Sequence, residues 1–228
     1  TEGIELWEDS YSIENTQSIN LVCVMCPASQ KLQGPIPPEI GLLTNLTVLN
    51  ILLNNISGPI PSEIGDLTNL ITLNLGYNNL SGPIPSEIGN LTNLNTLHLA
   101  GNHLSGAIPS EIGNLTNLEY LGLSQNQLYG VIPENICSLE DSVISQVLAS
   151  GNYFCPPYPP CIEDSSIQES EYCDNGIECI ADDGTDGNIL WGSCYSIENT
   201  TVINLSGNNG NDLGSLYGPI PPEIGQFL

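Results

Sequence analysis

Leucine and isoleucine recur along the middle of the chain with a period of 24 residues, and polar residues separate them in a fixed order. Four stretches align without gaps, and their common pattern is GxLTNLxxLxLxxNxLxGxIPxxI. A period of this length is typical of a solenoid, in which each repeat forms one coil that can bury its apolar face only against its neighbours. The four coils start at Gly41, Gly65, Gly89 and Gly113.

Inside each coil, a short alternation of apolar and polar residues predicts one β-strand. Leu73 and Leu75 flank Asn74, so the two leucine side chains lie on the same face of the strand and point into the core. We expect these strands to form a parallel sheet. Their predicted centres are Leu49, Leu73, Leu97 and Leu121.

Other recurring positions predict the rest of the coil. Pro85 fixes its backbone φ angle and disfavours a regular helix on the side opposite the strand. One asparagine in each coil is expected to be buried, where its amide can bond the free backbone groups of the turn. These ladder asparagines are Asn54, Asn78, Asn102 and Asn126.

The motif LSGxIPxxIGxLTNL resembles the consensus of the plant-type leucine-rich repeat, and the match covers residues 34 to 136. Similar repeats occur in receptor-kinase ectodomains, polygalacturonase inhibitors and some ice-binding proteins, and in proteins of aquatic microbes and algae. The resemblance implies an α/β-type solenoid. This would be a right-handed leucine-rich-repeat coil with a parallel concave sheet and a mostly irregular or 3-10 convex side. It also implies that ligands bind on the concave face.

The opening of the chain recurs near its end at an offset of 184 residues: Leu6-Trp7 matches Leu190-Trp191, and residues 34–41 match residues 218–225. Residues 1–40 are therefore interpreted as a cap and first partial repeat, and residues 41–161 as the solenoid, with an irregular last coil that has Asn152 in the ladder position. Residues 162–189 are interpreted as an acidic, cysteine-containing linker. Residues 190–228 are interpreted as the opening of a second unit. The chain starts with Thr1 and is interpreted as processed or partial.

The second unit stops where its first regular coil should begin, which would leave an inner layer of apolar side chains facing water. Burying each of them is worth roughly 1.5–3 kcal/mol. Another copy could cover this layer in a head-to-tail contact that builds an open filament, or the next coils of a longer array could follow. The uncovered residues are Leu216, Ile220, Ile224 and Phe227.

Eight cysteines lie outside the regular repeats, and an even number suits disulfides in an oxidising compartment, extracellular or at the cell surface. Cys137 and Cys161 are 24 residues apart, one coil of the stack, so we expect them to be bonded, with Cys155 as a competitor. The other pairings, assigned by proximity in the sequence, are Cys23 with Cys26, Cys194 with Cys173 or Cys179, and Cys155 with the one left over.

The charge of the chain excludes several classes of partner. It has 26 acidic residues and one basic residue, Lys31, for a net charge of −25. A chain with one cation cannot neutralise phosphates, which argues against nucleic acid and against an anionic membrane surface. No apolar stretch reaches 18 residues, so membrane insertion is not expected. Adaptation to a salty medium and a cation-binding role both remain open explanations of the charge.

Little in the sequence points to a cofactor or to catalysis. Asp182 and Asp186 match part of an EF-type calcium loop, but the third and twelfth places lack carboxylates, so an acidic turn competes with this interpretation. His98 and His103 have no nucleophile at a recognisable spacing and are expected to face solvent. The chain is therefore not predicted to be an enzyme.

The leading hypothesis is a secreted, glycosylated structural protein that assembles end to end, with copies of itself and glycans as partners. The alternative is a ligand-binding module, such as a receptor ectodomain or an inhibitor. Its concave positions are mixed and lack the regular Thr or Asn rows of an ice-binding face. They are Asn50, Leu52, Leu53, Thr72, Asn74, Tyr77, Thr96, His98, Gly101, Tyr120, Gly122 and Gln125. N-glycosylation motifs, which carry the sugar in this hypothesis, occur at Asn45, Asn55, Asn79, Asn90, Asn114, Asn199 and Asn204.

Overall fold

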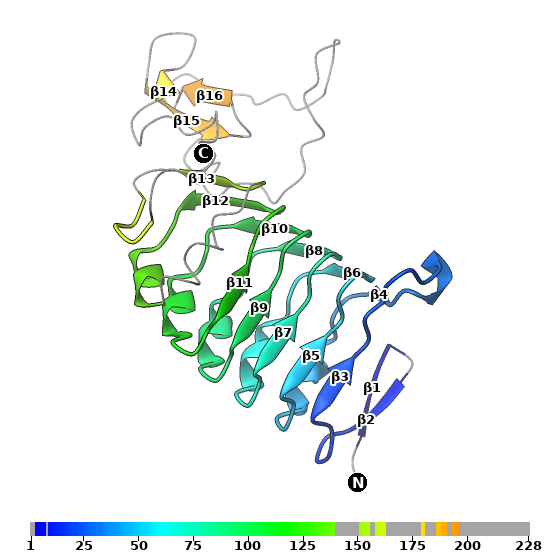
Figure 1. The fold of residues 1–228 in the computed structure, drawn as a ribbon. Helices are drawn as coiled ribbons and strands as arrows, with labels where there is room; N and C mark the ends of the chain where they lie inside the picture. The colour runs from blue at the N-terminus through cyan, green and yellow to red at the C-terminus, as the bar shows by residue number, and fades with distance from the viewer. Residues whose placement is uncertain are drawn as a thin grey trace. The chain divides into compact units, whose positions relative to one another are not determined.

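The computed structural model describes residues 3–7, 9–139, 151–155 and 158–162, and the strands at 179–180, 186–190 and 193–196. The chain divides into two compact units, residues 1–170 and 171–228. The first unit contains the stacked coils that the 24-residue period predicts (Figure 1).

One strand from each coil joins a five-stranded parallel sheet, which is the concave sheet of the solenoid. Leu49, Leu73, Leu97 and Leu121 stack in register at the strand centres and are fully buried, which confirms the predicted strands. The strands are β3 (Ser18–Asn20), β5 (Val48–Asn50), β7 (Thr72–Asn74), β9 (Thr96–His98) and β11 (Tyr120–Gly122).

Each coil also contributes a second strand to a six-stranded parallel sheet, so the prediction of one strand per coil was wrong. After each ladder asparagine the chain stays extended until a glycine at positive φ, such as Gly58 or Gly82 at 78°, turns it. Stacking places these extended segments side by side, and their backbone groups pair. The strands are β4 (Gln33–Gly34), β6 (Asn55–Gly58), β8 (Asn79–Gly82), β10 (His103–Gly106), β12 (Gln127–Val131) and β13 (Tyr153–Cys155).

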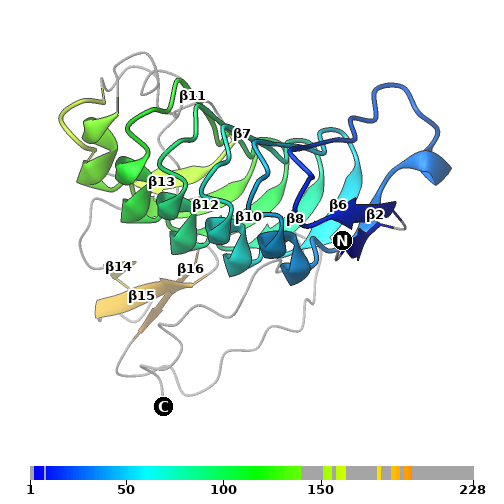
Figure 2. The same ribbon diagram turned by 90° about the horizontal axis from the view of Figure 1, so that it is seen from below.

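The convex side consists of short 3-10 helices, as the resemblance implies, and Figure 2 shows them side by side. A proline precedes the regular ones; Pro85 has φ −67° and ψ 140°, an extended conformation from which the next residues turn tightly. The Ile88 N–H then donates to the Pro85 carbonyl at 3.1 Å, a 3-10 bond. The helices are η1 (Ala28–Gln30), η2 (Pro38–Leu42), η3 (Ser62–Asp66), η4 (Ser86–Asn90), η5 (Ser110–Asn114) and η6 (Glu134–Ser138).

The four ladder asparagines are buried and fully hydrogen-bonded, as predicted. Asn78 accepts from the Ile56 N–H at 3.1 Å and donates to the carbonyls of Ile51, Leu75 and Gly76 at 3.0–3.1 Å. Its amide therefore joins two coils. Asn152 does the same in the irregular last coil: it accepts from the Leu128 N–H and donates to the carbonyl of Leu123.

A hairpin covers the N-terminal end of the core. It pairs β1 (Gly3–Leu6) with β2 (Asp9–Ser12) in antiparallel fashion. Leu6 is fully buried, and the Trp7 Nε1–H donates to the Pro35 carbonyl at 3.2 Å. These contacts fix the hairpin on the first coils.

Two disulfides are found among the described residues, both in the first unit. Cys137 is bonded to Cys161 with a Cα–Cα distance of 5.5 Å, the pair expected from the one-coil separation. Cys23 is bonded to Cys26 across a turn. Ile162, placed in the linker by the sequence interpretation, is buried in the core instead.

The second unit contains a hairpin that repeats the one at the start of the first unit. β15 (Asp186–Leu190) pairs with β16 (Ser193–Ser196), and β14 (Cys179–Ile180) adds a third antiparallel strand. Gly187 faces Ser196 just as Gly3 faces Ser12, so the register repeats at the offset of 184 residues. Strand β14 and the start of β15 fall inside the segment interpreted as a linker.

No helix in the part of the chain that the structure describes has the length and apolar character needed to cross a membrane.

Candidate binding surface

Three aromatic side chains form a row on the concave side, one from each of three consecutive coils. We call Tyr77, His98 and Tyr120 the aromatic row. The ring centroids of Tyr77 and His98 are 5.9 Å apart and those of His98 and Tyr120 are 5.5 Å apart, with interplanar angles of 81° and 89°. Such edge-to-face contacts stabilise the rings against one another. Tyr77 remains 47% exposed and Tyr120 38% exposed.

Three glycines make room for these rings. A Cβ atom on Gly101 would lie 2.6 Å from Cδ1 of Tyr77, and one on Gly122 would lie 2.7 Å from Cδ2 of His98. A Cβ on Gly76 would lie 2.9 Å from Cε1 of His98. The rings therefore lie directly against the backbone of neighbouring coils, where any larger residue would displace them. The glycines therefore allow the rings to pack directly on the backbone.

The imidazole of the row is neutral at neutral pH. His98 is half-buried between the two tyrosines, and this burial lowers the pKa of His98 below its ordinary value. A neutral imidazole offers one donor and one acceptor nitrogen. Both histidines were expected to face solvent. His103, at the start of β10, is exposed, but His98 is half-buried.

The concave face carries no charge on its strands. Five acidic side chains lie in the first turns of the convex helices η2–η6, and Asp66 ends η3. The strands of the concave sheet carry no carboxylate, and Glu119 directly precedes β11. The outward strand positions are Ser18, Asn20, Val48, Asn50, Thr72, Asn74, Thr96, His98, Tyr120 and Gly122.

A shallow groove of about 760 Å³ runs along the edge where the concave strands begin, and we call it the polar groove. The side-chain amides of Asn69, Asn93 and Asn117 each donate to a threonine carbonyl of the preceding coil at 2.7–2.9 Å. Within the described residues, their amide oxygens make no hydrogen bond. The rest of the lining is Gln17, Asn45, Thr47, Ile71, Asn95 and Glu119.

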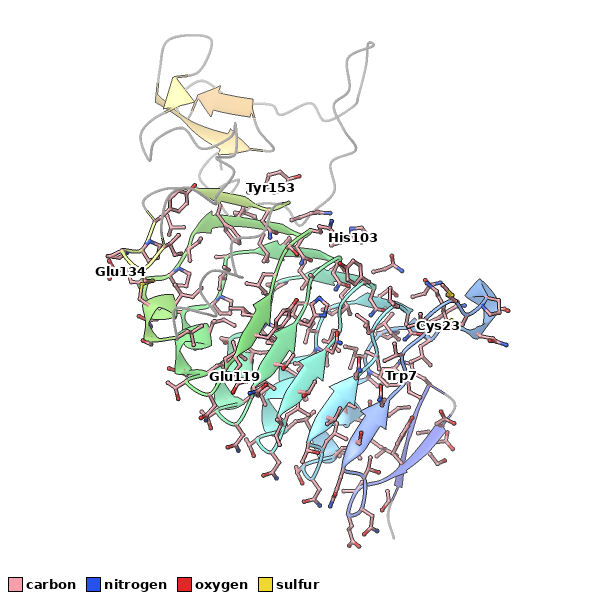
Figure 3. The ribbon with its side chains drawn as sticks, viewed as in Figure 1. Trp7, Cys23, His103, Glu119, Glu134 and Tyr153 are labelled. Carbon is pink, nitrogen blue, oxygen red and sulfur yellow. A yellow bond between two sulfur atoms is a disulfide. The ribbon has the colours of Figure 1, made fainter. Side chains whose placement is uncertain are left out.

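The polar groove reaches the aromatic row at β11. Glu119 lines the groove and directly precedes Tyr120, the first residue of that strand; Figure 3 labels Glu119 at this point. Tyr120 in turn pairs with Thr96 of β9, next to Asn95 of the groove. Tyr120 therefore lies one residue from the groove lining along the chain, and none of the three rings lines the groove itself.

The glycosylation motifs of the first unit lie on the surface. Asn45, Asn79, Asn90 and Asn114 are exposed, and Asn55 is half-buried. The Asn45 amide also donates to the Glu14 carbonyl at 2.9 Å. The other two motifs, Asn199 and Asn204, lie outside the described residues.

Several expected sites fall wholly or partly outside the described residues. Asp182 lies outside the described residues, and Asp186 is described only as the first residue of β15. A calcium site at these two residues therefore remains an expectation. Among the described residues, no three His, Cys, Asp or Glu side chains gather as a metal site would require. The pairings of Cys155, Cys173, Cys179 and Cys194 also stay predictions. The expected assembly residues Leu216, Ile220, Ile224 and Phe227 lie outside the described part.

The sequence missed the aromatic row as a unit, although the pattern placed all three residues on the concave side. The positions differ within their coils: Tyr120 begins a strand, His98 ends one, and Tyr77 lies in the turn after β7. The signal that could have identified the row is the coincidence of bulky rings with glycines at equivalent places in neighbouring coils.

Comparisons with known proteins agree with this architecture. The Leucine Rich Repeat family model matches residues 45–67, 69–91, 93–115 and 117–139. No curated protein matches the chain significantly.

Several solved structures are similar. The BIR3–SERK2 complex from Arabidopsis thaliana contains a chain with 36% identity, a TM-score of 0.52, and coverage of 63% of this chain and 72% of its own. The BIR2 ectodomain from the same plant has 32% identity, a TM-score of 0.50, and coverage of 60% and 69%.

The PEPR1–AtPEP1 structure has 32% identity and a TM-score of 0.50 over 64% of this chain. This chain spans only 22% of the matched PEPR1–AtPEP1 chain and 21% of a TDR receptor structure. The repeats, the stacked parallel sheets and these relatives lead to one conclusion: the chain belongs to the plant-type leucine-rich-repeat proteins.

Proposed function

We propose that this chain is an extracellular, non-enzymatic binding module that contacts its ligand through the concave face. The observation that carries the proposal is the aromatic row: two half-exposed tyrosines and a histidine packed on a floor of three glycines. Exposed aromatic side chains fixed by their surroundings are typical of residues that dominate binding energy, because little entropy is lost when they meet a ligand.

The relatives support a binding role. BIR3 was solved with SERK2, and PEPR1 with AtPEP1, so similar proteins are known in complexes. The two disulfides in the first unit fit an oxidising compartment, and the proposal therefore places the chain outside the cell.

The test uses the whole chain against a panel of soluble ligands of extracellular type, both oligosaccharides and synthetic peptides. We expect at least one panel member to bind the parent chain and to be lost from the variant Tyr77→Ala/Tyr120→Ala. The matched control is Tyr129→Ala, because Tyr129 is a 43% exposed tyrosine on the other sheet. Ligands that bind the row variant and the parent equally would contradict the proposal.

A second function, structural assembly, is favoured by a separate observation. The hairpin β15–β16 repeats the register of β1–β2, and in the first unit that hairpin covers a solenoid end. We propose that the chain carries the start of a second unit and extends into a head-to-tail array through Leu216, Ile220, Ile224 and Phe227. Electron microscopy of the purified chain should show filaments that Ile224→Asp abolishes. A monodisperse monomer at high concentration would contradict this function.

We also propose N-linked sugar on Asn79, Asn90 and Asn114, which are exposed in the first unit and lie outside the polar groove. Asn79 lies on β8, and Asn90 and Asn114 end the helices η4 and η5, so a sugar at these places would project away from the core. The intact mass of chain secreted from a eukaryotic host should fall after treatment with an N-glycan amidase. A mass equal to that of the bare chain before treatment would exclude the modification.

A further inference from the structure

We propose that the aromatic row and the polar groove together bind a neutral carbohydrate chain. The inference rests on the proposed concave-face function and adds the chemical class of the ligand. Three observations carry it: the spacing of the rings, the free amide groups of the groove, and the absence of charge on the concave strands.

The row offers one ring on each of three consecutive coils. Neighbouring ring centroids are 5.5–5.9 Å apart, a spacing comparable with the width of a pyranose ring. The C–H face of a sugar is apolar and packs against an aromatic ring, while its hydroxyls point sideways. Each tyrosine ring is nearly perpendicular to the imidazole between them, so a sugar chain lying across the coils would stack on the tyrosines and meet the imidazole at a different angle. The glycine floor lets these rings pack on the backbone before the ligand arrives.

The polar groove supplies the partners that sugar hydroxyls need. A hydroxyl is both a donor and an acceptor, and an amide side chain is its counterpart in both roles. Asn69, Asn93 and Asn117 use one amide hydrogen within the protein, which leaves the oxygen and the second hydrogen of each for a ligand. These amides recur once per coil, as the rings do, so the surface is matched to a repeating molecule.

Charge decides between ligand classes. A net charge of −25 with one cation repels phosphorylated, sulfated or uronic-acid chains. A basic peptide would favour several carboxylates along the row, but the outward strand positions have none, and Glu119, next to Tyr120, is the one carboxylate that lines the groove. A neutral ligand with many hydroxyls leaves no charge unpaired on this surface.

The experiment measures binding of the whole chain to three sets of probes by calorimetry or ligand-observed NMR. The probes are neutral oligosaccharides of glucose, mannose, xylose and N-acetylglucosamine, an oligogalacturonate, and a set of basic peptides. We expect a neutral oligosaccharide to bind, and Tyr77→Ala or Tyr120→Ala to weaken it about tenfold or more. Tyr129→Ala should leave the affinity unchanged.

A groove variant adds an independent readout. Asn95→Asp keeps the acceptor oxygen that the Thr96 hydroxyl uses at 3.1 Å, so the fold should be retained while a second carboxylate joins Glu119 in the groove. We expect this variant to weaken neutral-sugar binding about tenfold, and denaturant unfolding to match that of the parent chain.

The outcomes separate the inference from the proposed function. A peptide that binds through Tyr77 and Tyr120, with no sugar bound at millimolar concentration, would overturn the carbohydrate inference and leave the concave-face function standing. Preferred binding of the oligogalacturonate would overturn the neutral class. If no probe in any set depends on the aromatic row, both proposals fail.

Discussion

At the scale of single residues, the buried ladder asparagines are the most demanding positions of the coil. Each lies among leucines and isoleucines, yet each has every polar atom bonded. A buried amide is tolerated only because it satisfies backbone groups that the turn leaves free, and those groups depend on it in return.

This dependence can be tested with two adjacent asparagines. Asn78→Ala leaves the Ile56 N–H without its acceptor inside the core, so we expect it to cost about 1–3 kcal/mol of unfolding free energy, or more. Asn79→Ala is the matched control, since Asn79 is exposed. Urea unfolding of protein from a host that does not glycosylate would compare them. Equal losses of unfolding free energy in both variants would show that the buried ladder asparagine contributes nothing to stability beyond an exposed one.

The residue scale also includes a pH effect at His98. Because burial lowers the pKa of His98 from its ordinary value of 6.5, the unfolded chain binds this proton more readily than the folded chain. The contribution of His98 is therefore fully present above pH 6.5 and is lost as the pH falls through the lower folded-state pKa.

Comparison with His98→Gln isolates this effect from the titration of carboxylates. As the pH falls below 6.5, the parent chain should lose stability relative to His98→Gln. Thermal unfolding across a pH series would measure the difference. A parent–variant difference that stays constant over the series would contradict the assignment.

At the scale of elements, a coil is two short strands and a 3-10 helix, and close helix stacking sets its shape. Gly89 in η4 faces η5 so closely that a Cβ atom would lie 2.5 Å from Cβ of Glu111 and 2.7 Å from its carbonyl oxygen. Backbone cannot move aside as a flexible side chain can, because the next helix is held in the same way.

Gly89→Ala should therefore push two helices apart. We expect a loss of about 1–3 kcal/mol in unfolding free energy from this overpacking. Ser86→Ala, on the exposed side of the same helix, should change stability little. Denaturant titration measures the free energy of unfolding of the two variants. An unchanged unfolding free energy for Gly89→Ala would mean that the stacked helices can separate freely.

At the scale of the first unit as a whole, the two disulfides differ in what they hold. The Cys137–Cys161 bond ties residues 24 positions apart at the last coils, whereas Cys23–Cys26 closes a turn three positions long. A longer closed loop restricts the unfolded chain more strongly.

Removing the two bonds separately should show this difference. Cys137→Ser/Cys161→Ser should cost about 2–4 kcal/mol, and Cys23→Ser/Cys26→Ser clearly less. Melting temperatures of the two double variants under non-reducing conditions provide the measurement. The reverse order would mean that the turn, and not the last coil, limits the stability of the solenoid.

Much of this architecture could be predicted because the same pattern of apolar and polar residues occurs in four coils. The buried leucines, the ladder asparagines and the Cys137–Cys161 pair follow from a period and its side-chain alternation. The second sheet did not follow, since its strands, such as β8, lack a simple apolar alternation and form only because stacked coils bring them together. The aromatic row did not follow from the period either, because it depends on contacts between residues at three different places in their coils; the glycines one coil after Tyr77 and His98 were its only sequence signal.

The ladder has a consequence for the order in which the coils form. Each ladder asparagine bonds the coil that precedes it: Asn102 accepts from the Leu80 N–H, and Asn126 accepts from the Leu104 N–H. A coil therefore receives its last hydrogen bond from chain that is synthesised after it. As the protein leaves the ribosome, we expect each coil to become complete one coil late, so that the stack matures from its N-terminal end in a fixed sequence.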